Sequence, residues 1–214
     1  MSRLFAFAVP LLAAILGAFA LPAGALAQTD APTIDTGDTA WMLTSTALVL
    51  MMTIPGLALF YGGMVSVKSS TNMMMMTFGA AALVGVLWVL FGFSMTFGTS
   101  YGGFVGSFTE FAGMKDLLES NTTIAGLPVS LFSLFQALFA AITVALISGA
   151  VADRMKFGAW MVFAAVWAVL VYFPVAHWVF AFDSADGSVR GGWIANQLQA
   201  LDFAGGTVVH INAG

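Results

Sequence analysis

Four long apolar segments divide the sequence, at about residues 41–63, 73–97, 127–151 and 157–182. Each is close to the ~20 mostly apolar residues with which a helix crosses a bilayer. None of them alternates apolar and polar positions with the period of two that is typical of membrane β-barrels. A fifth apolar segment begins near residue 202 and is cut off at residue 214. The pattern therefore predicts an all-α membrane protein, built as a polytopic helical bundle.

The first 40 residues follow a different pattern. Residues 1–27 combine an early Arg3, a long apolar run and the small-residue sequence Ala25, Leu26, Ala27. These are the parts of a secretory signal peptide and its cleavage site. Because the apolar run is long for a signal peptide, an uncleaved first span is the alternative interpretation. Residues 28–40 are polar and acidic, and we expect them to form an exported N-terminal tail.

Charged residues between the segments predict the orientation of the chain. The two short loops contain Lys68, Arg154 and Lys156, whereas the two longer loops hold most of the acidic residues. Basic residues in short loops favour the cytoplasmic side of the membrane. We therefore expect the short loops inside the cell and the N-terminus outside it, so that the fifth segment enters the bilayer from outside.

Composition narrows the possible functions. The chain is 60% hydrophobic and 7% charged, against about a quarter charged residues in a soluble domain, so most of its surface faces lipid. A net charge of −4 gives no basic patch for nucleic acid. The absence of cysteine excludes disulfides and thiolate metal sites. The segments contain neither a nucleophile–histidine–acid set nor a phosphate-binding glycine loop, so we predict no enzyme, no cofactor and no metal site.

Two polar side chains in the fifth segment indicate chemistry inside the bilayer. At ~1.5 Å rise per residue, His210 lies roughly 12 Å below Asp202 and near the middle of a slab ~30 Å thick. Ionisable groups at that depth usually face a cavity or pathway; a histidine that only packs against another helix is the alternative. Asp202 lies where an N-cap is expected and can accept hydrogen bonds from the backbone of Ala204 or Gly205. Its other interpretation is a carboxylate that shapes a cation-attracting vestibule.

The third segment places two aromatic rings at a comparable depth. Phe135 and Phe139 share a helix face, roughly opposite a ridge of small residues, Ala137, Ala141, Ala145 and Gly149. Aromatic rings can attract a small cation or close a pore, and a lipid-facing or core stripe is the alternative. Gln136 is a polar group within the span, and we expect it to be hydrogen-bonded between helices. His177 falls near the outer end of the fourth segment, where an interfacial role is favoured over ligation.

Three stretches of this chain resemble the Amt/Mep/Rh ammonium transporter family, and the bacterial Amt branch closely. They are TALVLMMTIPGLALFYGGMV, LFQALFAAITVALISGAVADR and DFAGGTVVHINAG, and the resemblance covers about residues 41–214. It implies the first of two inverted repeats of an eleven-helix subunit, assembled as a homotrimer with one pore in each subunit. The family chain is about twice as long, so we expect this to be an N-terminal half that alone neither folds stably nor conducts.

The resemblance also implies a role for each candidate residue. Phe135 matches the aromatic lining of the outer ammonium-recruitment site, and Phe139 matches one ring of the stacked phenylalanine gate below it. His210 matches the first member of the family's twin-histidine pair, and Asp202 matches the aspartate that organises the vestibule.

One position departs from the family pattern. Phe180 stands where the family commonly has a tryptophan that completes the cation site. Trp178 lies two residues earlier, and Trp193 lies beyond an inserted loop. Which of the three rings fills the site stays open at this point.

The function implied by the resemblance is transport of ammonium, or methylammonium, across a bacterial inner membrane. The cation is recruited outside, deprotonated, and passed as ammonia along a hydrophobic pore lined by histidine. An ammonium sensor that uses the same membrane fold is the alternative, which the sequence beyond these residues would decide. The family also implies a cytoplasmic PII-type regulatory protein as a partner, although no residue here carries a signal for it.

Overall fold

The computed structural model describes residues 33–117, 123–184, 187 and 190–214. Residues from Ile34 onward form one compact unit. The predicted signal peptide and residues 28–32 of the predicted tail lie outside the described residues. Residues 36–40, which the sequence assigned to the tail, are helical.

Four helices of the described residues are long and apolar enough to span a membrane, Thr36–Met64, Val67–Phe97, Val129–Val151 and Phe157–Phe180. The predicted segments are therefore present, with earlier starts for the first two. The first span begins at Thr36 because the Asp35 carboxylate caps it, accepting a hydrogen bond of 2.8 Å from the amide of Asp38. Hydropathy alone does not include this polar first turn.

Three of these four spans are interrupted by a π-helical turn. The first consists of α2 (Thr36–Met51), the π-turn η1 (Met52–Gly56) and α3 (Leu57–Met64). The second consists of α4 (Val67–Leu87), η2 (Trp88–Gly92) and α5 (Phe93–Phe97). The fourth consists of α7 (Phe157–Trp167), η5 (Ala168–Tyr172) and α8 (Phe173–Phe180).

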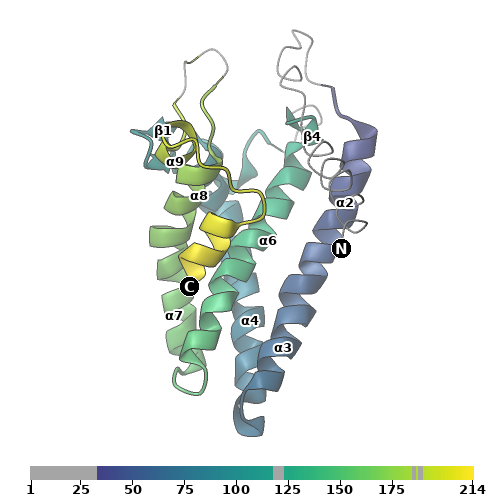
Figure 1. Ribbon diagram of the computed structural model, residues 1–214, viewed down its shortest axis with the longest axis vertical. Coiled ribbons are helices and arrows are strands. Elements are labelled where there is room, and N and C mark those ends of the chain that lie inside the picture. Colours follow the sequence, from purple (N-terminus) through teal and green to yellow (C-terminus); the bar gives the residue numbers. More distant parts are fainter. Residues whose placement is uncertain (1–32, 118–122, 185–186, 188–189) are drawn as a thin grey trace, which may run out of the picture. The chain divides into compact units, whose positions relative to one another are not determined.

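The third span runs through the middle of the unit. It consists of α6 (Val129–Ile147) and a closing 3₁₀ turn, η4 (Ser148–Val151). Half of its most apolar stretch is buried, more than in any of the other three spans. Figure 1 shows α6 between α7 and α8 on one side and α2 and α3 on the other, and it contacts both α2 and α4.

Small residues let α6 approach its neighbours closely. Ala141 and Ala145, from the predicted ridge, are buried. At the lower end of α6, Gly149 lies against the ring of Tyr61, where a β-carbon would come within 3.2 Å of the ring atoms. The Tyr61 hydroxyl donates a 3.1 Å hydrogen bond to the Leu146 carbonyl, which ties the first span to the third.

An aromatic cluster joins the second, third and fourth spans. Trp88 packs edge-on against Phe93 and Phe173, with ring centroids 5.9 and 5.8 Å apart. The Trp88 indole N–H donates to Ser133 Oγ at 3.1 Å, and the Trp160 indole N–H donates to the Met76 carbonyl at 2.9 Å. These bonds satisfy buried indole groups that would otherwise cost free energy.

The long connections gather at the end that lies uppermost in Figure 1, which we call the upper end. They contain the short strand pairs β1 (Ser100–Tyr101) with β2 (Val105–Gly106), and β3 (Thr123–Ile124) with β4 (Leu127–Pro128). They also contain the 3₁₀ turn η3 (Ala112–Met114) and the single-turn helix α9 (Trp193–Asn196). The π-turn η6 (Gly206–Ile211) begins the fifth segment.

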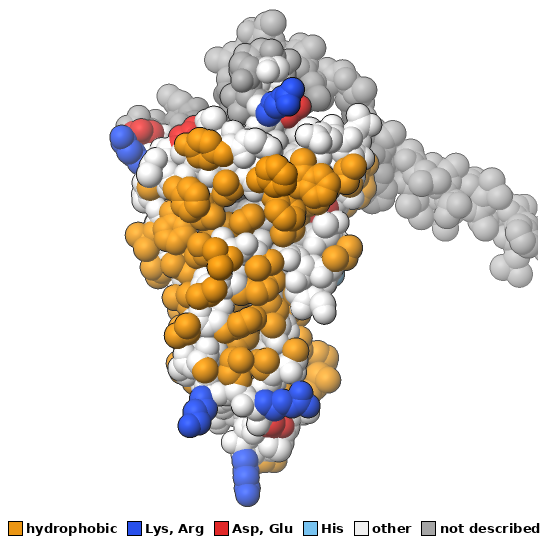
Figure 2. All heavy atoms as spheres, turned by 90° about the vertical axis from the view of Figure 1, so that its left-hand side faces the viewer, with side chains coloured by type: hydrophobic (Ala, Val, Ile, Leu, Met, Phe, Trp, Pro, Cys, Tyr) orange, Lys and Arg blue, Asp and Glu red, His pale blue; other side chains and the backbone are white. Residues whose placement is uncertain are grey.

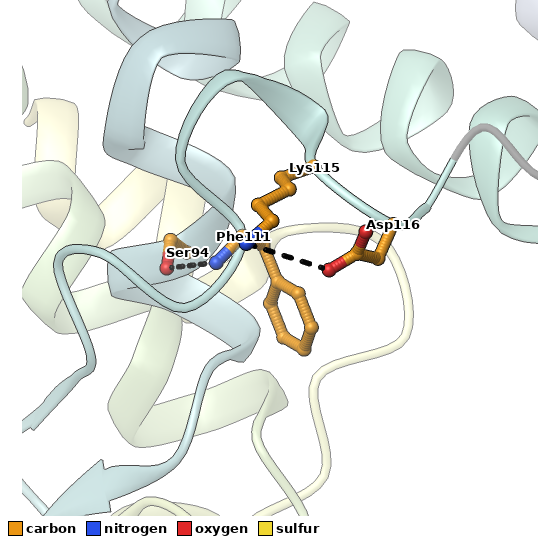
Figure 3. A network of polar contacts seen from close by, with 4 residues as sticks. All are labelled: Ser94, Phe111, Lys115 and Asp116. Carbon is orange, nitrogen blue, oxygen red and sulfur yellow. Dashed lines mark hydrogen bonds and ion pairs between the residues drawn. The ribbon is translucent and has the colours of Figure 1, made fainter.

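The connection after α5 is folded back onto that helix through Ser94. Its hydroxyl donates to the Ser107 carbonyl at 2.6 Å. It also accepts a hydrogen bond of 3.0 Å from the Phe111 amide (Figure 3). The nearby ion pair of Lys115 and Asp116 has a 4.0 Å separation and exposed side chains. A pair of this kind contributes little to stability, so the buried serine is the stronger link.

The outside of the unit suits a lipid environment. Trp41, Leu59 and Leu170 are each about two-thirds exposed or more. Figure 2 shows hydrophobic side chains over the middle of one face, with Lys and Arg side chains at its two ends. Such a band between charged ends is expected for a protein that crosses a bilayer.

Candidate functional site

Asp202 caps the start of the fifth segment with both of its carboxylate oxygens. Oδ1 accepts from the amides of Gly205 (2.6 Å) and Gly206 (2.9 Å). Oδ2 accepts from the amides of Thr207 and Val208, both at 2.9 Å. The predicted cap is therefore present, although Ala204 is not among its donors. A negative charge here is also favoured by the partial positive charge of a helix N-terminus.

Gly205 lets the chain turn sharply into η6. Its φ of +79° lies in the left-handed region that favours glycine, and a β-carbon would come within 2.6 Å of the Val209 side chain. The Gly205 carbonyl accepts hydrogen bonds from the amides of Val209 (2.9 Å) and His210 (2.8 Å). This turn fixes where the His210 side chain leaves the backbone.

A pocket of about 390 Å³, which we call the upper pocket, lies between η6, α6 and α8. Phe135 and Phe139 line it from α6, Phe180 lines it from α8, and Asp202 lies at its edge. The rings of Phe135 and Phe139 are 4.9 Å apart at an interplanar angle of 63°. They therefore meet edge to face and are not stacked in parallel.

A second pocket of about 540 Å³, the lower pocket, contains His210. Its other lining residues include Phe139 of α6, Met52 and Gly56 of η1, and Phe60 of α3. Phe139 thus borders both pockets, with Phe135 and Asp202 on one side and His210 on the other. The imidazole shares a pocket with Phe139, and no described helix separates the two side chains.

The four residues chosen from the sequence are therefore brought together around two adjoining pockets. The contribution of the first span, through η1 and Phe60, was missed. The sequence carried one signal for it, because Pro55 lies within η1 and removes a backbone donor from the middle of the span. Hydropathy does not register such a break.

The structure also distinguishes the three candidate rings at the position that departs from the family pattern. Phe180 lines the upper pocket together with Phe135. Trp178 instead packs against Trp193, with centroids 5.8 Å apart, and its indole N–H donates to the Phe104 carbonyl at 2.6 Å. Neither tryptophan is among the residues that line the upper pocket.

His177 occupies a different environment from His210. It is completely buried, with Nδ1 2.7 Å from the Thr96 carbonyl and Nε2 2.8 Å from Ser100 Oγ. The carbonyl can only accept, so Nδ1 carries the proton and Nε2 accepts from the serine hydroxyl. Ser100 Oγ accepts in turn from the Gly103 amide at 3.1 Å. This buried ring links α8 to the end of α5 and to β1, in the last turn of the fourth span.

The part of the chain that the structure describes brings together no three histidine, aspartate or glutamate residues that could hold a metal ion. Its site consists of aromatic rings, one capped carboxylate, one amide side chain and one imidazole. These groups can interact with a small polar or cationic solute through ring faces and hydrogen bonds.

The fold defines a polytopic α-helical membrane protein with two adjoining pockets between its spans. A model of the Ammonium Transporter Family matches residues 40–214. This chain belongs to that family.

Individual relatives agree with this assignment. An ammonium transporter of Mycobacterium tuberculosis is 56% identical over 195 residues, covering 84% of this chain and 40% of the relative. One of Aquifex aeolicus is 50% identical over 181 residues, covering 85% and 40%. The crystal structure of Saccharomyces cerevisiae Mep2 is similar with a TM-score of 0.71 at 32% identity, covering 86% of this chain and 40% of that one. The chain therefore spans about 40% of the length of these relatives.

Proposed function

We propose that the protein containing this chain transports ammonium, and methylammonium as its analogue, across a bacterial inner membrane. The observation that carries the proposal is the position of Phe139. Its ring borders a pocket with an aromatic wall and a carboxylate above, and a pocket with a histidine below. The curated relatives are named ammonium transporters, which favours transport over the sensor alternative.

The physical difficulty for such a protein is the cost of moving a charge through an apolar passage. An unpaired ion in a medium of low polarity is disfavoured by many kcal/mol. That cost is avoided if the cation is recruited at the upper pocket, gives its proton to water there, and passes as neutral ammonia into the lower pocket. A neutral imidazole has one donor and one acceptor nitrogen, so His210 can exchange hydrogen bonds with ammonia.

In this scheme the aromatic residues act on the cation directly. Phe135 and Phe180 present ring faces or edges to the upper pocket, where a cation gains from the ring quadrupole. Phe139 separates the two pockets and must move aside for a solute to pass. Asp202 acts mainly through the backbone, because its four hydrogen bonds hold η6 in place beneath the cation.

The family assignment also suggests how the protein is oriented in the membrane and how it assembles. We propose a cleaved signal peptide at 1–27, a periplasmic N-terminus, and a homotrimer of complete subunits. The loops that carry Lys68, Arg154 and Lys156 then face the cytoplasm, as the distribution of basic residues favours. A PII-type regulator would bind on that side. The second half of the subunit is expected to supply the second histidine and gate ring.

Uptake of labelled methylammonium by the full-length protein tests the proposal. The protein is expressed in cells that lack their own ammonium transporters, and uptake is measured against an empty-vector control. We expect uptake that unlabelled ammonium suppresses. Uptake equal to the vector control, with the protein present in the membrane, would contradict transport. A kinase or cyclase domain in the remainder of the reading frame would then favour the sensor.

A further inference from the structure

Gln136 is a polar side chain in the site that the transport scheme leaves without a role. It lies on α6 between Phe135 and Phe139 in sequence, is only partly buried, and lines the upper pocket. The bond between helices expected from the sequence is absent, since its side chain makes no hydrogen bond to any residue that the structure describes. An amide within a span normally finds a partner, because an unpaired one is costly in an apolar medium.

The other polar side chain of the pocket cannot bind a cation in the same way. An ionised carboxylate offers about four lone-pair positions. The backbone amides of residues 205–208 already occupy four on Asp202, two on each oxygen. The remaining lining side chains are phenylalanine, alanine and valine, which have no acceptor. Among the side chains of the upper pocket, Gln136 alone has an acceptor that no described residue uses.

We propose that the amide oxygen of Gln136 accepts a hydrogen bond from the bound cation and makes the upper pocket selective for ammonium-type cations over alkali ions. This inference rests on the proposed function, because it assigns a residue to the recruitment step of that scheme. The rings of Phe135 and Phe180 attract any cation of suitable size. A potassium ion resembles ammonium in size and charge but has no N–H group to donate, so ring attraction alone discriminates poorly between them.

The amide also suits methylammonium. Methylammonium has three N–H groups, one of which can donate a hydrogen bond to Gln136, while its methyl group lies against the aromatic wall. The amide is neutral, so it does not hold the cation as a carboxylate does. Since a hydrogen bond to a charged group is stronger than one between neutral groups, its loss is expected to weaken binding by about tenfold.

The test compares substitutions of Gln136 in the full-length protein. Gln136→Leu removes the acceptor at similar size, and Gln136→Glu retains an acceptor oxygen. Gln197→Leu is the matched control, because Gln197 is exposed at the upper end and does not line the upper pocket. Labelled methylammonium uptake is measured over a range of concentrations, with ammonium or potassium as competitor, at equal amounts of protein in the membrane.

For Gln136→Leu we expect the half-saturating methylammonium concentration to rise about tenfold, with the maximal rate changed less than about threefold. The preference for ammonium over potassium as competitor should fall by about the same factor. Gln197→Leu should stay within about threefold of the wild type in half-saturation. Gln136→Glu, which keeps an acceptor oxygen and adds a negative charge, should not raise the half-saturating concentration. If the leucine variant fails to reach the membrane, Gln136→Met replaces it, with the same expectations.

Two results would overturn the inference while leaving transport intact. One is wild-type half-saturation and competitor preference in the leucine or methionine variant. The other is an equal loss of affinity in the leucine and glutamate variants, which indicates a packing role. Absence of uptake by the wild type contradicts the proposed function itself, so the two failures are distinguishable.

Discussion

The two histidines of the described chain lie in contrasting environments. His177 is completely buried and uses both ring nitrogens in hydrogen bonds to Thr96 and Ser100. His210 is exposed and lines the lower pocket, and among the described residues only its backbone is hydrogen-bonded, to the Gly205 carbonyl and the Gly214 amide. The first ring is therefore part of the scaffold, whereas the second remains available to a solute.

An ionisable residue in a span is therefore not by itself a functional residue. Both histidines lie in apolar segments of the sequence, so hydropathy does not separate them. What separates them is whether protein groups already occupy their donor and acceptor positions. Substitutions at the two sites should accordingly change different properties, stability at one and transport at the other.

The largest effect is expected for His177→Ala. The substitution leaves a cavity, removes a donor from the Thr96 carbonyl, and removes the acceptor of the Ser100 hydroxyl proton. Together these should lower stability by ~3–5 kcal/mol, measured as the thermal midpoint of the full-length protein in detergent. An unchanged midpoint would show that the buried hydrogen bonds of His177 are not needed for the scaffold.

Asp202→Ala should have the next largest effect on stability. It removes the acceptor of four backbone amides. The free energy of unfolding should fall by ~2 kcal/mol, which is at the upper end of the values for loss of a helix cap. Amide hydrogen exchange at Thr207 and Val208 should quicken at the same time. Asp35→Ala is the matched control, because Asp35 caps α2 through one amide only. Equal losses in the two variants would contradict a special role for the four-bond cap.

His210→Ala should leave stability nearly unchanged, within ~0.5 kcal/mol. Methylammonium uptake or selectivity should change by about tenfold, which corresponds to ~1.4 kcal/mol in a barrier. The measurement is uptake by the full-length protein at several pH values, with the thermal midpoint recorded alongside. Wild-type uptake at every pH would count against a role for this ring in the pathway.

The smallest effect is expected for substitutions in α8. There Phe180 lines the upper pocket, whereas the nearby Trp178 packs against Trp193. Phe180→Leu should raise the half-saturating methylammonium concentration by about two- to fivefold, as loss of one cation–π contact implies. Trp178→Leu, at a ring outside the upper pocket, should lower stability without that change in affinity. The opposite outcome would place the tryptophan, not Phe180, beside the cation.

The four spans were predictable for one physical reason. A bilayer forces long apolar helices, so the segments that end near Phe97, Val151 and Phe180 could be located from hydropathy. Motif resemblance then selected Phe139 and His210, which the structure places around one pocket.

What could not be predicted depends on neighbours in space. The burial of His177 is determined by Thr96 and Ser100, which come from distant parts of the chain. The Gln136 amide was expected to bond to another helix, but it has no hydrogen-bond partner among the described residues. Hydropathy values describe each residue separately and contain no information about these contacts.

The π-turns in η1, η2 and η5 have a consequence for how such chains are aligned. A π-turn closes its hydrogen bond over five residues where an α-turn uses four, so each contains one additional residue. A homologue with a regular α-helix at the same place would therefore align only with a single-residue gap inside a hydrophobic segment. A single-residue gap near Pro55 or Tyr172 would therefore mark one inserted residue, and the two chains would still be homologous on both sides of it.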